Sequence, residues 1–333
     1  MQRYVPAEWS PHKAMWIGFP SHAEVWLDDL TAAQAEVAAL ARALAGPGAE
    51  RVRLLVSGDE AEAAARALLS DTSVEIVRGV FGDIWLRDTG PIFIDDNGAP
   101  AAAGFRFNGW GGKYEMEGDE EVAGQLAAAA GVPLLANDVI LEGGSLDHDG
   151  LGTVLTTRQC VLNANRNTGW TEAAAAAAFA RALGVRKVLW LDDGLLHDHT
   201  DGHVDNLARF VAPGVVACPM AYGVDDPNAA VYARVAQALA GMTDARGSAL
   251  QVTRIPSPGR VLDDSGDVVP ASHMNFLIAN GAVIVPLYDT PSEAFAVEAL
   301  AGLFPERQVI GLPSRAILTG GGSFHCISQQ EPA

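Results

Sequence analysis

One order of predicted secondary-structure elements repeats along the chain, and this repeat constrains the fold more than any other feature. The order is strand, turn, strand, helix, strand, and it recurs about every 50 to 65 residues, a period typical of repeat architectures. Roughly five such modules fit into 333 residues. No residue identities recur between modules, so an ordinary two-layer α/β domain is the alternative.

Alternating helix and strand signals define the modules. Stretches of good helix formers predict helices at Thr31–Ala45, Glu60–Leu69, Glu120–Ala130, Thr171–Leu183, Asn228–Ala240 and Ser292–Leu303. Short β-branched or apolar stretches predict the strands that follow them, at Val52–Val56, Val74–Val77, Val132–Leu135, Val185–Leu191, Leu250–Ile255 and Gln308–Leu312. Turn residues predict two hairpins, Leu207–Val211 with Val215–Cys218 and Phe276–Ile278 with Val283–Pro286.

The charge balance limits the partners. The chain has 41 Asp and Glu against 22 Lys and Arg, a net charge of −19, and its basic residues never form a run. Binding to nucleic acid or to an anionic membrane surface is therefore not expected, whereas a cationic small molecule would be attracted. No signal peptide or membrane span is visible, so we expect a cytoplasmic protein with a single domain over 1–333.

The residues that do not fit the core pattern fall where one module ends and the next hairpin begins. They occupy Asp83–Asp88, Glu142–Ser145, His197–Asp205, Pro270–Asn275 and Gly320–Cys326. If the modules surround an axis, these points converge. Carboxylates, a histidine and a cysteine would then form a polar centre, which is the usual anatomy of an active site.

The three cysteines are predicted to differ in role. They lack CxxC spacing, so neither a disulfide framework nor a structural zinc site is indicated. Cys326 follows three glycines and adjoins His325, which favours a nucleophile, with a buried structural thiol as the alternative. Cys160 and Cys218 lie in apolar strand patterns and are expected to be buried and structural.

Thr200–Asn206 places Asp201, His203 and Asp205 at a spacing of two. In an extended strand, the three side chains would face the same way. Three interpretations stay open: a general acid/base with a separate cation anchor, a metal site that includes His199, and a solvated strand face.

Asp83 and Asp88 flank Trp85 and Arg87. One carboxylate can pair with Arg87 while the other holds a cation against the face of Trp85. Glu142, before two glycines, is either a solvated charge or a ligand contact.

Trp110 lies in a glycine-hinged aromatic loop, 107–114, that is either a lid or packs on the scaffold.

Eight motifs occur in order at Pro6–Pro20, Asp83–Pro91, Phe107–Tyr114, Leu141–Ser145, Asn163–Asn167, Thr200–Asn206, Ala271–Phe276 and Gly320–Gln330. Together they resemble the motifs of the agmatine deiminase and bacterial peptidyl-arginine deiminase family, and the match runs from Pro6 to Pro332. The resemblance implies an α/β fold, a pseudo-fivefold α/β propeller (pentein) of ββαβ modules, in agreement with the repeat.

The resemblance also implies roles for individual residues. Cys326 is similar to the family's nucleophile, His203 to its general acid/base, and Glu142 to the acidic partner of that histidine. The residues that the resemblance places around the substrate are Asp88 and Asp205, which bind the guanidinium, with Trp85, Trp110 and Asn275.

Three departures from the family pattern lie beside these residues. Ser323-Phe324 stands where the family usually has Asn-Ile, His273 stands where Tyr is common, and His197–His199 differs from the typical agmatine enzymes. The departures leave the chemistry in place and bear on recognition of the substrate's tail.

The implied activity is that of a hydrolase of linear amidines, converting agmatine to N-carbamoylputrescine and ammonia through a covalent thiouronium on Cys326. It needs no metal and no organic cofactor, its partner is a small cationic guanidine, and a homodimer is possible. Three alternatives remain: a deiminase of free or peptidyl arginine, a non-catalytic cation-binding protein, and a metallohydrolase with the ligands His197, His199, Asp201, His203 and Asp205.

Overall fold

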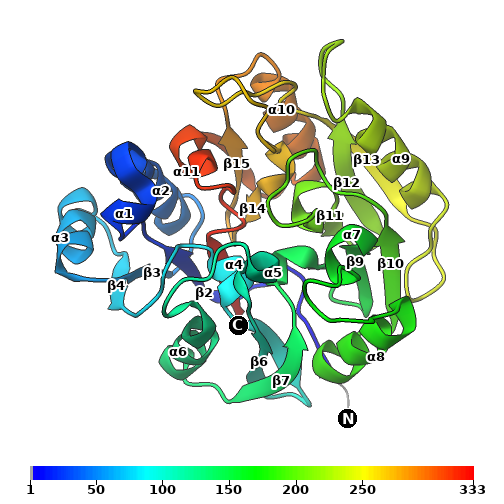
Figure 1. The fold of residues 1–333 in the computed structure, drawn as a ribbon, viewed down its shortest axis with the longest axis horizontal. Coiled ribbons are helices and arrows are strands. Elements are labelled where there is room, and N and C mark those ends of the chain that lie inside the picture. Colours follow the sequence, from blue (N-terminus) through cyan, green and yellow to red (C-terminus); the bar gives the residue numbers. More distant parts are fainter. Residues whose placement is uncertain (1–2) are drawn as a thin grey trace.

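Five small sheets surround a common centre, and they follow one another around it in chain order (Figure 1). This computed structural model describes residues 3–333; residues 1 and 2, where the predicted domain 1–333 begins, lie outside the described residues. In spatial order the sheets contain β17 (Ser328–Pro332), β2 (His12–Gly18), β3 (Val52–Val56) and β4 (Glu75–Arg78); β1 (Arg3–Tyr4), β5 (Ile92–Asp96), β6 (Pro100–Arg106) and β7 (Leu134–Ile140); β10 (Lys187–Leu191), β9 (Thr153–Thr157) and β8 (Asp147–His148); β11 (Arg209–Ala212), β12 (Val215–Met220) and β13 (Gln251–Pro256); and β14 (Leu277–Ile278), β15 (Ala282–Leu287) and β16 (Gln308–Pro313).

The helices connect the strands within these sheets and between them. The longer ones are α2 (Leu30–Ala45), α3 (Asp59–Leu68), α6 (Val122–Ala130), α8 (Glu172–Leu183), α9 (Ala229–Ala240) and α10 (Glu293–Leu303). The short ones are α1 (Ala23–Trp26), α4 (Leu86–Thr89), α5 (Gly109–Gly112), α7 (Arg158–Val161) and α11 (Arg315–Thr319), with the 3-10 turns η1 (Leu27–Asp29), η2 (Asp119–Glu121), η3 (Gly143–Ser145), η4 (Val204–Asn206) and η5 (His273–Asn275).

Each sheet repeats one unit, as the fourth shows. Strands β11 and β12 pair antiparallel across a tight turn, and β13 then returns parallel to β12 after the crossover helix α9. A parallel pair needs such a crossover, which explains the order strand, turn, strand, helix, strand. The predicted five-module α/β propeller is confirmed, and the two-layer alternative is wrong.

Local chemistry sets the ends of the helices. Thr171 caps α8, because its side chain accepts a hydrogen bond from the Ala174 amide, and Gly184 ends the same helix with a φ of 72°. All six predicted helices and their following strands are present, with ends shifted by a few residues. The largest shift is at β7, which begins two residues later than predicted and extends to Ile140.

The ring closes through the last strand. Strand β17 pairs antiparallel with β2, so the two ends of the chain build one sheet. The sequence Ser-Gln-Gln-Glu-Pro did not predict this strand, because its side chains are polar although its first four residues are buried. The side chains of Gln329 and Gln330 instead accept hydrogen bonds from Arg87 Nη1, each at 2.7 Å.

Two local predictions were wrong. Cys160 lies in α7 and not in a strand, because Thr157 caps that helix and accepts a hydrogen bond from the Cys160 amide at 3.3 Å. The segment Thr200–Asn206 is not extended either, since Asp201 and Gly202 have φ values of 64° and 90° and η4 follows them. Positive φ at two successive residues turns the chain, so the spacing of two no longer aligns side chains.

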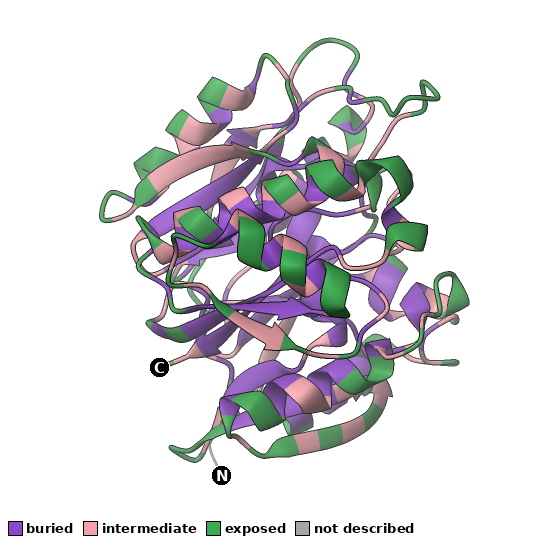
Figure 2. Cartoon of the chain, turned by 90° about the vertical axis from the view of Figure 1, so that its left-hand side faces the viewer, coloured by how far each residue is buried: buried purple, intermediate pink, exposed green. Residues whose placement is uncertain are grey.

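The core lies on the strands and on the inner faces of the helices, whereas the outer helix faces are exposed (Figure 2). Burial on both sides explains why strands such as β15 are apolar throughout. Among the described residues, the structure contains no helix that combines the length and the apolar character needed to cross a membrane.

Candidate active site

A short turn precedes the first strand of each sheet, and the five turns meet at the centre of the ring (Figure 1). These turns are α4 before β5, η3 before β8, η4 before β11, η5 before β14, and the residues 323–327 before β17. They bring Asp88, Glu142, His203, Asp205, Asn275 and Cys326 to the centre. The predicted convergence of these segments is confirmed.

Asp88 lies at the middle of this group. Its Oδ1 accepts a hydrogen bond from the Gly144 amide, and its Oδ2 accepts one from Trp110 Nε1, both at 2.9 Å. A Cβ atom on Gly144 would lie 2.6 Å from His203 Nδ1, 2.8 Å from Asp88 Oδ1 and 3.2 Å from Asp205 Oδ2. Only glycine fits there, and the three side chains therefore surround one small volume.

His203 is fully buried between two carboxylates. Its Nδ1 lies 3.7 Å from Asp88 Oδ1, and its Nε2 lies 3.9 Å from Glu142 Oε2. Neither ring nitrogen has a hydrogen-bond partner. The other oxygen of Glu142 accepts a hydrogen bond from Arg166 Nε at 2.8 Å, which holds this carboxylate in place.

Cys326 is held by Asn275 and Asp205. Asn275 Nδ2 lies 3.1 Å from Cys326 Sγ and its Oδ1 accepts a hydrogen bond from the Cys326 amide at 3.2 Å. The same Nδ2 also lies 3.4 Å from Asp205 Oδ2, and the thiol lies 3.7 Å from that oxygen. Asn275, which the resemblance places around the substrate, thus contacts the thiol directly.

Behind Asp205 lies a network of charges that the sequence did not predict. His325 Nδ1 contacts Asp205 Oδ2 at 2.8 Å, and its Nε2 contacts Glu8 Oε2 at 3.2 Å. Glu8 also pairs with Arg209, whose Nε donates to Asp147 Oδ2 at 2.6 Å. The only signal in the sequence was the position of His325 beside Cys326.

Trp85 and Trp110 lie beside the site and line the pocket that leads to it. Trp110 has a φ of 53° and donates to Asp88, so it is part of the site. Trp85 donates to Asp83 Oδ2 at 2.7 Å, and its ring would lie 2.5 Å from a Cβ on Gly322. Gly320 and Gly322 make room for this ring, and together with Gly321 they also line the pocket that leads to Cys326.

A pocket of about 360 Å³ leads to the thiol. Its walls are formed by Glu24, Val25, Asp83, Trp85, Asp88, Trp110, Tyr114, Met116, His199, Thr200, residues 319–322 and Cys326. His203 and Asp205 lie deeper and have no exposed surface. A larger hollow of about 700 Å³ lies against Arg3 and Arg186, away from all of these site residues.

The five residues of the metallohydrolase alternative do not come together. His197 and His199 are exposed, and His199 Nδ1 lies 2.8 Å from the Tyr114 hydroxyl. Asp201 pairs with Lys113 at 2.7 Å and with Arg166. The predicted pairing of Arg87 with a neighbouring aspartate is also wrong, because Arg87 donates to Gln329 and Gln330.

Burial and charge shift the pKa values of the site in opposite directions. Burial lowers the pKa of His203, but the charge of Asp88 and contacts with Cys160 and Glu142 outweigh it and hold the pKa well above its ordinary value. Burial, together with Asp205 and Asp88, raises the pKa of Cys326 well above that of a free thiol. The site is therefore prepared to stabilise a positive charge and disfavours a thiolate in its absence.

The pKa values of Asp88 and Asp205 are also shifted in opposite directions. Burial raises the pKa of Asp88, and the charge of His203 offsets this only in part. Burial also acts to raise the pKa of Asp205, but the hydrogen bond and charge of His325 outweigh it and lower the pKa. Asp205 therefore keeps its negative charge at lower pH than Asp88.

A ring of five ββαβ modules with carboxylates, a histidine and a cysteine at its centre defines the pentein class of α/β propellers. Within that class, residues 4–332 match the Porphyromonas-type peptidyl-arginine deiminases, and the chain belongs to this family.

The relatives of the chain in that family include proteins named agmatine deiminases. The chain is 39% identical over 357 aligned residues to agmatine deiminase of Stutzerimonas stutzeri, covering 99% of this chain and 95% of that protein. The solved agmatine deiminase of Enterococcus faecalis is 32% identical with a TM-score of 0.93, covering 99% of this chain and 96% of that one. A cysteine-to-serine variant of C. jejuni agmatine deiminase with substrate bound is 27% identical with a TM-score of 0.90, covering 100% and 97%.

Proposed function

We propose that the protein is an agmatine deiminase, which hydrolyses agmatine to N-carbamoylputrescine and ammonia. The observation that carries the proposal is the convergence of two carboxylates, a buried histidine and a cysteine in a chain that is 39% identical to an agmatine deiminase over 99% of its length. A guanidinium is planar, cationic and resonance-stabilised, so it needs both a rigid anchor and a strong nucleophile.

Asp88 and Asp205 are the proposed anchors. A carboxylate accepts two N–H groups of a guanidinium side by side, which fixes the orientation of its central carbon. The Asp205 Oδ1 atom is buried without a hydrogen-bond partner, so it is free to accept one from the substrate. Asp88 and Trp85 line the pocket that leads to Cys326, and the ring of Trp85 offers a face to the cation.

Cys326 is the proposed nucleophile and His203 the proposed acid and base. The arriving cation stabilises the thiolate, so the thiol gives its proton to water and becomes reactive despite its raised pKa. The thiolate adds to the guanidinium carbon, and protonated His203 gives its proton to the leaving nitrogen, which departs as ammonia. This leaves a thiouronium on Cys326 and a neutral His203.

In the hydrolysis of the thiouronium, His203 changes from acid to base. His203, neutral after the first step, takes a proton from water, and the hydroxide adds to the thiouronium carbon. The carbon–sulfur bond breaks, the sulfur leaves as thiolate, the added hydroxyl group gives its proton to water, and the neutral ureido product departs. Glu142 lies 3.9 Å from His203 Nε2 and is the proposed acidic partner that stabilises the imidazolium in both steps.

The pocket favours agmatine over arginine. An α-carboxylate would need a positive partner, and no Lys or Arg is among the described residues that line the pocket. Three cations are candidates for such a partner: Arg209 is fully buried against Glu8, Lys113 is paired with Asp201, and Arg106 is exposed and does not line the pocket. Glu24, by contrast, lies at the pocket and suits a terminal ammonium.

We also propose that residues 1–333 act as one catalytic domain, because the closing strand β17 joins the first sheet and directly follows Cys326. The homodimer and the cytoplasmic location stay predictions.

The test is turnover of three substrates by the full-length protein in EDTA. Agmatine, arginine and an arginine peptide are incubated separately, and ammonia and ureido product are measured, with Cys326→Ala as control. We expect rapid turnover of agmatine alone, and none with Cys326→Ala. Turnover of arginine or the peptide in place of agmatine would contradict the substrate assignment, and turnover that survives Cys326→Ala would contradict the mechanism.

A further inference from the structure

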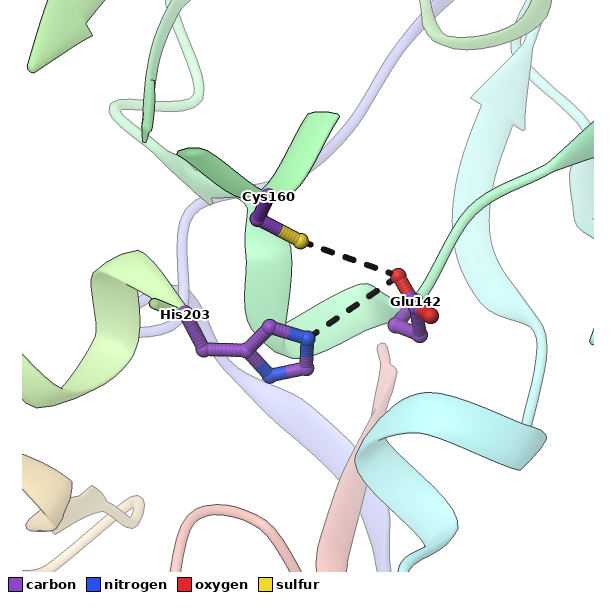
Figure 3. A group of neighbouring side chains, drawn as sticks. All are labelled: Glu142, Cys160 and His203. Carbon is purple, nitrogen blue, oxygen red and sulfur yellow. Dashed lines mark hydrogen bonds and ion pairs between the residues drawn. The ribbon is translucent and has the colours of Figure 1, made fainter. Parts of the chain in front are cut away.

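A second buried cysteine lies against the proposed acid–base pair, and the deimination mechanism does not use it. Cys160 Sγ lies 3.9 Å from Glu142 Oε2, the same oxygen that lies 3.9 Å from His203 Nε2. Cys160 and His203 come from separate segments and both point at this carboxylate (Figure 3). The thiol is fully buried, so it faces no solvent.

The three side chains offer three ligand atoms for a metal ion, the number that zinc takes from a protein when water fills its fourth position. One atom from each of Glu142, Cys160 and His203 lies within 4.8 Å of the others. His203 Nε2 is buried and has no hydrogen-bond partner, so no bond has to break before it binds an ion. Histidine nitrogen, thiolate sulfur and carboxylate oxygen are the ligands that Zn²⁺ takes in proteins.

The two distances to Glu142 Oε2 fit such an ion after a small contraction. Zinc bonds of about 2.0 to 2.3 Å at tetrahedral angles separate neighbouring ligand atoms by roughly 3.3 to 3.5 Å. The two contacts to Glu142 Oε2 are 3.9 Å, so the side chains need to move inward by about half an ångström. Arg166 holds the other oxygen of Glu142 at 2.8 Å, and this outer contact would orient the carboxylate as a ligand.

We propose that Glu142, Cys160 and His203 form a binding site for Zn²⁺ or a similar thiophilic divalent cation, and that its occupation inhibits the enzyme. Coordination requires a thiolate on Cys160 and a deprotonated Nε2 on His203. When the ion binds, each of these two atoms therefore releases its proton to water. Bound metal would keep His203 from transferring protons. The binding itself is independent of the proposed function, whereas the inhibition rests on it.

Direct metal binding is measured first, with Co²⁺ as the spectroscopic probe. The full-length Cys326→Ser protein is freed of metal and titrated with Co²⁺, so that the proposed nucleophile cannot contribute a thiolate. We expect one equivalent to produce a thiolate-to-cobalt charge-transfer band that Zn²⁺ removes. Adding Cys160→Ser, or Cys160→Ala as a second variant, should abolish the band, while Cys218→Ser, another buried thiol, should leave it unchanged.

Inhibition is measured in parallel on proteins that retain Cys326. Zn²⁺ should inhibit agmatine turnover, and Cys160→Ser should raise the concentration for half-inhibition at least about tenfold, as expected when a metal site is weakened. A band that persists without Cys160, or no band at all, would overturn the metal site. Inhibition that is unchanged in Cys160→Ser would overturn the assignment of inhibition to this site.

The two measurements separate the two proposals. A Cys160-dependent band in a protein that turns over no agmatine would support the metal site and contradict the proposed function. Turnover of agmatine without any band would support the proposed function and contradict the metal site. Circular dichroism of each cysteine variant establishes that a lost band reflects a lost ligand and not a lost fold.

Discussion

Among the buried histidines at the centre of the ring, His325 and His203 differ in their surroundings. His325 contacts Asp205 at 2.8 Å and Glu8 at 3.2 Å, and these carboxylates belong to a network anchored by Arg209. His203 has carboxylates at 3.7 and 3.9 Å and no hydrogen bond from either ring nitrogen. A histidine with partners for both ring nitrogens has a fixed geometry, whereas unsatisfied buried groups are costly unless another molecule completes them. We infer that the His325 side is scaffold and the His203 side is reserved for the reaction.

The sharpest test of this difference is loss of the imidazole of His203. His203→Asn should lower kcat for agmatine by about 10²- to 10⁴-fold, the usual contribution of general acid–base catalysis. The matched control is His199→Asn, because His199 lines the pocket but is exposed. Steady-state ammonia release provides the measurement, and a loss in His203→Asn no larger than that of the control would contradict the role of His203.

On the scaffold side, the largest effect should be on stability. Arg209→Met leaves Glu8 and Asp147 buried without their cation, which typically costs about 3–5 kcal/mol. The free energy of unfolding from urea titration measures this cost. Arg260→Met is the control, because Arg260 forms a half-exposed pair with Asp225 and its loss should change stability by less than about 0.5 kcal/mol. Equal stability of the two variants would show that the network is not a scaffold.

His325 connects the two sides, and its loss should appear in the pH profile. The pKa of Asp205 is held low by His325, so the carboxylate loses its charge only at low pH. His325→Leu removes this partner, the pKa of Asp205 rises, and the acid limb of kcat/KM for agmatine moves to higher pH. His325→Asn, which can still donate a hydrogen bond, should restore the profile in part. An acid limb that stays in place in His325→Leu would contradict a positioning role for His325.

The sequence could predict features that depend on neighbouring residues, but not those that depend on distant partners. The modules were predictable because helix formers and apolar strands repeat with their own periods, as at α9 and β13. Strand β17 was not, because its glutamines are buried by pairing with Arg87, which lies about 240 positions earlier. Polar residues buried by a distant partner carry no local signal of their burial.

The site shows the same limit. Cys326, His203, Asp88 and Asp205 stood out because chemically reactive residues interrupt an apolar pattern at the end of each module. The place of Cys160 beside Glu142 could not be predicted, since a threonine cap turned an apparent strand into a helix. Glu8 was missed because it meets His325 only through the closing of the ring.

The smallest expected effect lies at the mouth of the pocket, outside both histidine regions. Glu24 lines the pocket, but its side chain is 78% exposed, so water screens any pairing with the terminal ammonium of agmatine. Such exposed pairs contribute about 0.2–1 kcal/mol, and Glu24→Gln should therefore raise KM for agmatine by only about 1.5- to 5-fold without changing kcat. The effect should fade as salt is added, because screening weakens exposed charges first.

A substrate without the terminal charge sharpens this last prediction. Butylguanidine keeps the guanidinium but lacks the ammonium, so its KM should be the same in Glu24→Gln and in the unmodified protein. Asp28→Asn is the matched control, since Asp28 is exposed nearby and does not line the pocket. If Glu24→Gln raises KM equally for both substrates, Glu24 acts on the guanidinium end or on the pocket itself, and the tail of the substrate must be recognised elsewhere.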